Sequence, residues 1–90
     1  MEEAVSLYKQ AERLGSVLAS GYLGTMYAQG AGGLTKDMET AVKKWTVGAK
    51  NGHKSSIRNL IKYYQSKKNN KQVVYWKKQL SNILSDDNND

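Results

Sequence analysis

Cysteine and proline are both absent from this chain of 90 residues. The lack of cysteine excludes disulfides, thiol catalysis and cysteine-based metal sites. The lack of proline, together with few runs of β-branched residues, predicts a single all-α domain. No stretch of 18 apolar residues occurs, and the N-terminus has neither the basic nor the apolar region of a signal peptide. We therefore expect no membrane partner and favour a cytoplasmic location for the chain as given.

Acidic residues are absent from the long segment 40–85, which holds eleven lysines or arginines. Residues 1–39 hold five acids and three bases, and residues 86–90 form an acidic, polar end that we predict to be a disordered tail. The formal net charge is +6. The second half of the chain should therefore project a positive field toward an anionic partner.

Apolar residues recur at helical spacing in five segments, which predicts helices over 2–14, 17–29, 38–50, 54–66 and 71–85. Gly15 and Gly30 are placed to end the first two helices, and Ser16 and Asp37 to cap the second and third. In the first, second and last helices the predicted inward residues are Ala4, Leu7, Tyr8 and Ala11; Ala19, Tyr22, Leu23, Met26 and Tyr27; and Val73, Trp76, Leu80, Ile83 and Leu84. Because no helix buries its apolar stripe alone, we expect antiparallel helical hairpins.

An internal repeat relates these helices to one another. A shift of 37 residues places Tyr8 on Trp45, and a shift of 31 residues places Trp45 on Trp76. A period of about 35 to 40 residues built from two helices is typical of an α-solenoid.

The central copy of the repeat carries a recognisable pattern. It consists of Leu23-Gly24, Tyr27, Gly30 and Gly32, then Asp37, Ala41 and Trp45, and finally Gly52-His53. This pattern resembles the Sel1-like repeat family, whose repeats are close relatives of tetratricopeptide repeats. The resemblance covers a half-repeat at 1–15, a repeat at 16–52 and a degenerate repeat at 53–85. Ile61 departs from the pattern, since the family has glycine at that position.

The resemblance implies a short right-handed α-solenoid of about five antiparallel helices. It also implies a non-enzymatic adaptor, of a kind common in bacteria, that binds an acidic or extended segment of a protein partner. Because the chain begins on a second-type helix, it has the form of a piece cut from a longer solenoid.

The resemblance also indicates a binding surface. Related tetratricopeptide solenoids hold peptides in a groove lined by the first helix of each repeat, at positions beside the core stripe. In this chain such a groove would be small and apolar at the helix over 17–29 and cationic at the helix over 54–66. The predicted partner-binding residues are Leu18, Thr25, Ser55, Arg58, Lys62 and Gln65.

No motif typical of an enzyme or a cofactor site is found in the sequence. The glycine-rich segment 30–36 matches neither of the phosphate-binding patterns GxxxxGK[ST] and GxGxxG, and it follows a helix. His53 is the single histidine, and no acid follows it within thirty residues, which predicts a structural role. The paired acids lie at helix starts or in the tail, where they suit the helix dipole or solvation. We expect no catalysis, no bound metal and no cofactor.

Two alternatives remain open for the function. One is nucleic-acid binding through residues 40–85, where lysines interleave with Tyr63 and Tyr75. The other is a structural fragment that stacks on further repeats or on another copy, using a face of the first helix that includes Val5 and Leu14. A monomer or a weak homo-oligomer is expected in solution.

Overall fold

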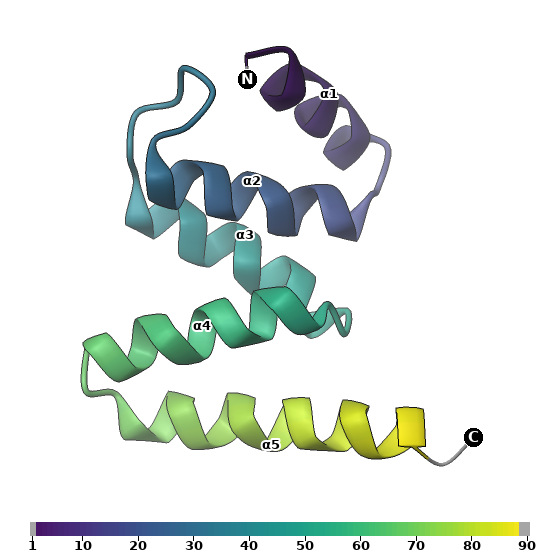
Figure 1. Cartoon of the computed structure of the whole chain (residues 1–90), viewed down its shortest axis with the longest axis vertical. Helices are drawn as coiled ribbons and strands as arrows, with labels where there is room; N and C mark the ends of the chain where they lie inside the picture. Colours follow the sequence, from purple (N-terminus) through teal and green to yellow (C-terminus); the bar gives the residue numbers. More distant parts are fainter. Residues whose placement is uncertain (1, 89–90) are drawn as a thin grey trace.

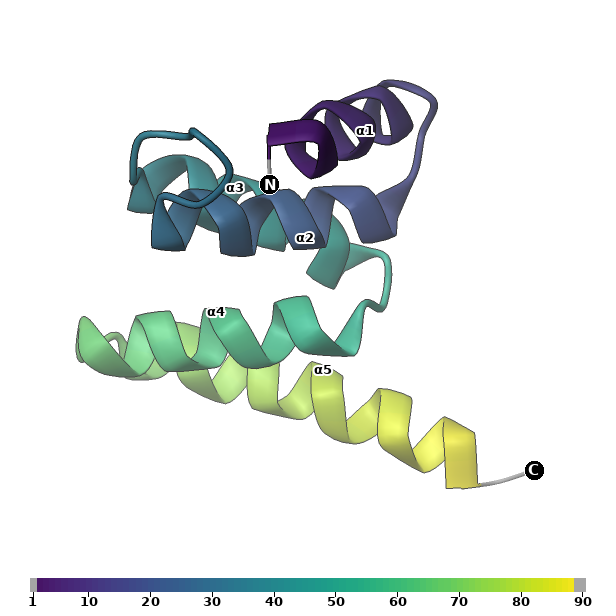
Figure 2. The ribbon, with the colours of Figure 1, turned by 45° about the horizontal axis from the view of Figure 1, so that its top comes forward.

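The structure, a computed structural model, describes residues 2–88 and is all-helical across them, as predicted. Its helices are α1 (Glu2–Arg13), α2 (Val17–Gln29), α3 (Met38–Lys50), α4 (Lys54–Ser66) and α5 (Asn70–Asn88). Each helix packs on the next one along the chain, and α1 and α5 lie at opposite ends of the longest dimension (Figure 1). Contacts are most extensive between α2 and α3 and between α4 and α5. Figure 2 shows these pairs as α3 behind α2 and α5 behind α4.

Capping residues set the ends of the central helices where the sequence predicts them. The Ser16 Oγ accepts a hydrogen bond from the Ala19 backbone N–H at 3.2 Å, and the Asp37 Oδ1 accepts one from the Thr40 N–H at 3.1 Å. Gly30 ends α2 in the left-handed conformation, with φ 67° and ψ 34°. Local chemistry therefore explains why α2 begins and ends, and α3 begins, where predicted. The bounds of α4 also agree with those predicted, although its N-cap residue His53 makes no capping hydrogen bond through its side chain.

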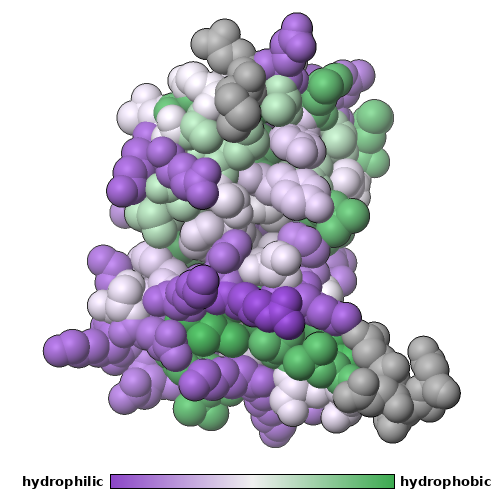
Figure 3. All heavy atoms as spheres, viewed as in Figure 1, coloured by the Kyte–Doolittle hydropathy of each residue, from purple (hydrophilic) through white to green (hydrophobic). Residues whose placement is uncertain are grey.

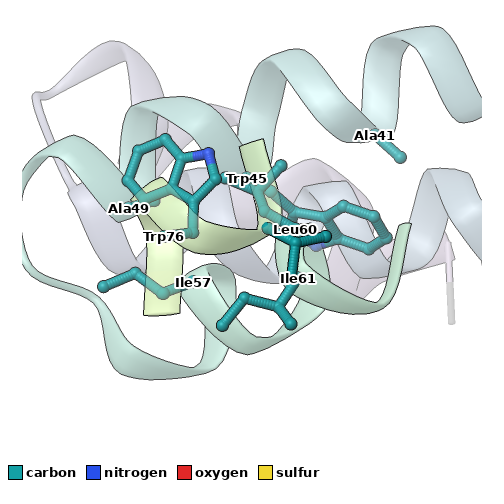
Figure 4. Packing of buried hydrophobic residues seen from close by; sticks show 8 residues of the cluster. Ala41, Trp45, Ala49, Ile57, Leu60, Ile61 and Trp76 are labelled. Atoms are coloured by element: carbon teal, nitrogen blue, oxygen red, sulfur yellow. The ribbon is translucent and has the colours of Figure 1, made fainter. Parts of the chain in front are cut away.

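The core consists of two clusters of buried side chains. The larger joins α3, α4 and α5, and its two indole rings, from Trp45 and Trp76, lie among the branched side chains of α4 (Figure 4). The smaller joins α1 to α2 through Val5, Leu23 and Met26. Leu23 is fully buried, so α2 is held on both of its sides.

The buried side of α1 differs from the predicted one. Leu7, predicted to point inward, is 65% exposed, and Val5, predicted to be exposed, is buried at 6%. Two residues span about 200° around a helix, so the side chains of Val5 and Leu7 point in nearly opposite directions. Because α1 packs extensively on α2 alone, it buries one narrow side and leaves Leu7 outside. Leu14, just beyond the helix, is 83% exposed as predicted.

The last helix is longer than predicted. It runs to Asn88 rather than ending at Ser85, so the backbone of the predicted disordered tail is helical as far as it is described, while residues 89 and 90 lie outside the described part. The helix has 19 residues against 13 in α4, and its C-terminal end passes beyond α4 in Figure 1. Leu84, in the last turns of α5, is 37% exposed, which corrects the prediction that it is buried.

A half-buried ion pair ties α1 to α3. The Lys44 Nζ lies 2.7 Å from Glu12 Oε1 and 2.9 Å from Glu12 Oε2, and the Ser20 hydroxyl donates to Oε2 at 2.8 Å. Partial desolvation raises the pKa of Glu12, but the hydrogen bonds from Lys44 and Ser20 and the charges of Lys44 and Lys9 outweigh it. The net effect lowers the pKa of Glu12 below its ordinary value of 4.5.

The Glu12→Gln variant should therefore lose stability in a pH-dependent way. A lowered folded-state pKa means that the carboxylate stabilises the fold above pH 4.5 and loses this effect as the pH falls through the folded-state pKa. We expect the free energy of unfolding to fall by about 1 kcal/mol at neutral pH, and the difference from the native chain to shrink in acid. Urea unfolding at both pH values measures it, with Glu3→Gln as the control on the same helix. An equal loss at both pH values would contradict the assignment.

Candidate functional site

The principal hollow of the described surface lies where α1, α2 and α4 meet. We call it the α2 groove; it has a volume of about 410 Å³, and it is lined by Ala4, Tyr8, Gly21, Tyr22, Thr25, Met26, His53, Ser55 and Asn59. Helix α2 supplies four of the lining residues. Helix α1 contributes an apolar and an aromatic side chain, and α4 contributes two polar ones. The groove thus combines apolar walls with a few polar groups, as sites for ligands and peptides commonly do.

Three rings form one wall of the α2 groove. The ring centroids of Tyr8 and Tyr22 are 5.3 Å apart with an interplanar angle of 39°, and those of Tyr22 and His53 are 6.0 Å apart at 77°. Tyr22 was predicted to be buried, but it is 47% exposed because it stands between α1 and α4 rather than beneath α3. Its exposed ring is the largest surface in the groove on which a partner's side chain can pack.

Glycines hold the helices close beneath this wall. A Cβ added at Gly21 would lie 2.6 Å from His53 Nδ1, and one added at Gly48 would lie 2.5 Å from Ser56 Oγ. Ser56 is fully buried, and its Oγ lies 2.6 Å from His53 Nδ1, the tautomer deciding which atom donates. Because Ser56 is inaccessible to a substrate, this serine–histidine contact orients the ring and packs three helices together.

Thr25 links the groove to the core. Its hydroxyl oxygen accepts from Trp45 Nε1 at 3.3 Å and from Asn59 Nδ2 at 3.4 Å, and it donates to the Gly21 carbonyl at 3.5 Å. These internal contacts occupy the hydroxyl, so Thr25 shapes the wall, while Asn59 is oriented at the groove by its own contact with Thr25.

The six predicted partner-binding residues divide into two sets. Thr25 and Ser55 line the α2 groove, and Leu18 and Ser55 line a second hollow of about 390 Å³ that adjoins it at His53 and Ser55. Arg58, Lys62 and Gln65 line neither hollow and are exposed on α4. The structure thus places three of the six in the walls of these two adjoining hollows, which together we call the depression.

The exposure of Arg58 contrasts with the burial of Gly21, which lies 37 residues earlier in the chain. A shift of 37 residues places Arg58 on Gly21, which is buried because the start of α4 packs against it. Within the described residues no hairpin packs on α4 in the same way, so Arg58 stands in solvent at the side of the groove. Figure 3 shows a band of hydrophilic side chains across α4. Arg58 and Lys62 are both exposed positions of this helix.

Sequence reasoning missed the groove residues Tyr8, Tyr22, His53 and Asn59. The signal for Asn59 was present: Ser55 and Asn59 are four residues apart and share a helix face, as do Leu18 and Tyr22 at the equivalent positions of α2. The prediction instead took a step of three residues from Ser55, to Arg58, which does not line the groove.

Metal sites and membrane spans are not found in the part of the chain that the structure describes. No group of three or more histidines, aspartates or glutamates there is arranged to hold a metal ion. None of the described helices combines the length and the apolar character needed to cross a membrane.

Searches of protein-family models, of curated proteins and of solved structures find no match to this chain.

Proposed function

We propose that the chain is a protein-interaction module of the Sel1-like class, a short right-handed α-solenoid of antiparallel helices that acts as a non-enzymatic adaptor. The alternation of extensive and smaller contacts along the chain supports a two-helix repeat. The contact of Gly24 with Trp45 supports the family pattern, because a Cβ on Gly24 would lie 2.6 Å from Trp45 Cδ1. In this pattern the Trp45 ring occupies the space that a side chain at position 24 would otherwise fill.

The α2 groove carries the proposal for the partner. It adjoins the second hollow at His53 and Ser55, so an extended segment can contact both hollows at once. A bulky apolar side chain of the partner would pack on Tyr22 and Met26, while Ser55 and Asn59 offer hydrogen bonds to its backbone. No cofactor takes part in this recognition.

Charge selects among extended segments. Arg58 and Lys62 are exposed on α4 beside the depression, and residues 40–85 contain no acid to offset them. Carboxylates next to the anchoring side chain would therefore be favoured, and the association rate would rise at low salt. The proposed ligand is an acidic segment with one large apolar side chain.

Selection from a random peptide library displayed on phage tests this function. We expect enriched peptides to combine acidic residues with a large apolar residue. Fluorescence anisotropy measures the affinity for a selected peptide. The affinity should fall about tenfold in Tyr22→Ala, a loss of about 1.4 kcal/mol of binding free energy, because the aromatic anchor is removed. The Arg58→Glu/Lys62→Glu double variant should lower the affinity as well.

A matched charge reversal separates a specific groove from general attraction. Lys36→Glu/Lys43→Glu changes the charge by the same amount at one exposed position just before α3 and one on α3, and neither residue lines the groove or the adjoining hollow. It should leave the affinity almost unchanged at physiological salt, where exposed charges are screened beyond about 8 Å. Equal losses from both double variants, or selected peptides indifferent to Tyr22→Ala, would refute the proposal.

A further inference from the structure

The outer face of α5 is a surface separate from the α2 groove. Lys71, Val74, Tyr75 and Lys78 follow one another at i, i+3, i+4 and i+7 and form a patch that we call the α5 face. Val74 is 66% exposed and Tyr75 is 51% exposed. The residues that flank this pair in the sequence, Val73 and Trp76, are buried in the cluster with α4. The Tyr75 ring meets the Trp76 ring edge to face at 4.9 Å between centroids, so the buried indole supports it.

Packing within the fold does not account for this patch. The shift of 31 residues that places Trp45 on Trp76 also places Lys43 on Val74 and Lys44 on Tyr75. In α3 the second of these positions is used internally, because Lys44 pairs with Glu12 of α1. In α5 an exposed aromatic ring stands in its place, and Tyr75 lines none of the hollows described above.

Positive charge surrounds the exposed ring. Lys71 and Lys78 lie one turn before and one turn after Tyr75, about 10 Å apart along the helix axis. Lys67 and Lys68 lie in the turn before α5, where the Lys67 Nζ lies 5.8 Å from the centroid of the Tyr63 ring. No acid occurs between residues 40 and 85 to neutralise these lysines.

We infer that the α5 face binds single-stranded nucleic acid, with a base stacked on Tyr75 and the flanking phosphates held by Lys71 and Lys78. Tyr75 lines none of the hollows described above, and a planar base can stack on such an exposed ring without a pocket. In a duplex the base faces are already stacked, so only an unpaired strand can offer one to Tyr75. Lysines on both sides of the ring neutralise the backbone without reading sequence.

Two labelled strands of equal charge test this inference by fluorescence anisotropy: a short oligothymidylate, and an abasic strand of the same number of phosphates. We expect the native chain to bind the base-bearing strand more tightly. The Tyr75→Ala variant should lose about tenfold in affinity for that strand and almost nothing for the abasic one, and Tyr75→Phe should retain the native preference. Circular dichroism shows whether each variant is folded.

Charge variants test the phosphate contacts. The Lys71→Gln/Lys78→Gln variant should bind both strands more weakly. The magnitude of the slope of log affinity against log salt concentration should fall by about 1.4, at about 0.7 for each lost phosphate contact. Lys43→Gln/Lys50→Gln, with the same loss of charge on α3, should change the slope little. Tyr22→Ala should leave nucleic-acid binding unchanged, so this inference and the peptide-binding proposal fail independently.

Three results would overturn the inference. Equal affinity for the base-bearing and abasic strands would show attraction to any polyanion, and so would equal losses from the two lysine pairs. Displacement of the strand by poly-glutamate at equal charge would assign the α5 face to an acidic polypeptide instead.

Discussion

Replacing Trp45 with alanine should cost about 3–5 kcal/mol of the free energy of unfolding, the largest effect expected of a single substitution in this chain. The indole is 6% exposed, contacts Gly24 of α2, donates to the Thr25 hydroxyl and packs in the cluster of α3, α4 and α5. Its removal leaves a cavity between α3 and the helices on which the indole packs. Because small domains have about 5–15 kcal/mol of stability in total, the variant should unfold at a much lower urea concentration.

Val47→Ala is the matched control for this prediction. Val47 lies on the same helix but is 46% exposed, so its truncation should change stability by less than about 0.5 kcal/mol. Urea titrations followed by far-UV circular dichroism give both values. If Trp45→Ala lost no more than Val47→Ala, the indole would not have the packing role described.

Adding one methyl group at Gly48 should be the second large effect. Alanine favours a helix over glycine by about 1 kcal/mol, but the new Cβ would lie 2.5 Å from the Oγ and 3.1 Å from the Cβ of Ser56. Ser56 is fully buried and bonded to His53, so it has little room to yield. We expect Gly48→Ala to lose about 1–3 kcal/mol in urea unfolding followed by tryptophan fluorescence.

The same substitution should have the opposite sign when Ser56 is removed. In a Ser56→Gly background the two close contacts disappear, and the next nearest atom, His53 Cβ at 3.5 Å, is at ordinary contact distance. Gly48→Ala should then be neutral or stabilise the chain by up to about 1 kcal/mol through helix propensity. Equal losses in both backgrounds would show that the cost does not arise at Ser56.

The helix bounds that depend on a single residue's chemistry could be predicted from sequence. Ser16, Gly30 and Asp37 each act through hydrogen bonds or backbone angles within a few residues, so α2 and α3 begin and end where expected. The exposed sides of the end helices could not be predicted in this way. Whether Leu7 and Leu84 are buried depends on how far the neighbouring helix covers them, and periodicity within one helix does not contain that information.

The candidate site shows the same division. The spacing that selected Ser55 and Thr25 located part of the α2 groove, because both lie beside the core stripe of their helices. Asn59 was missed because a step of three or four residues from Ser55 fits the pattern equally well. Tyr22 was assigned to the core because it falls in the apolar stripe of α2, and periodicity does not show that its ring lies between α1 and α4. His53 could be assigned a structural role, but its ring forms a groove wall only once α4 packs on Gly21.

The packing of each helix mainly on its neighbour in sequence has a consequence for how the chain folds. Most contacts form between segments that are close in sequence, so little loop entropy is lost before they form, and folding within about microseconds to milliseconds is typical of such topologies. The two ends need never meet. Helix α1 and the overhanging end of α5 can therefore open and exchange their amide hydrogens while the centre around Trp45 stays closed.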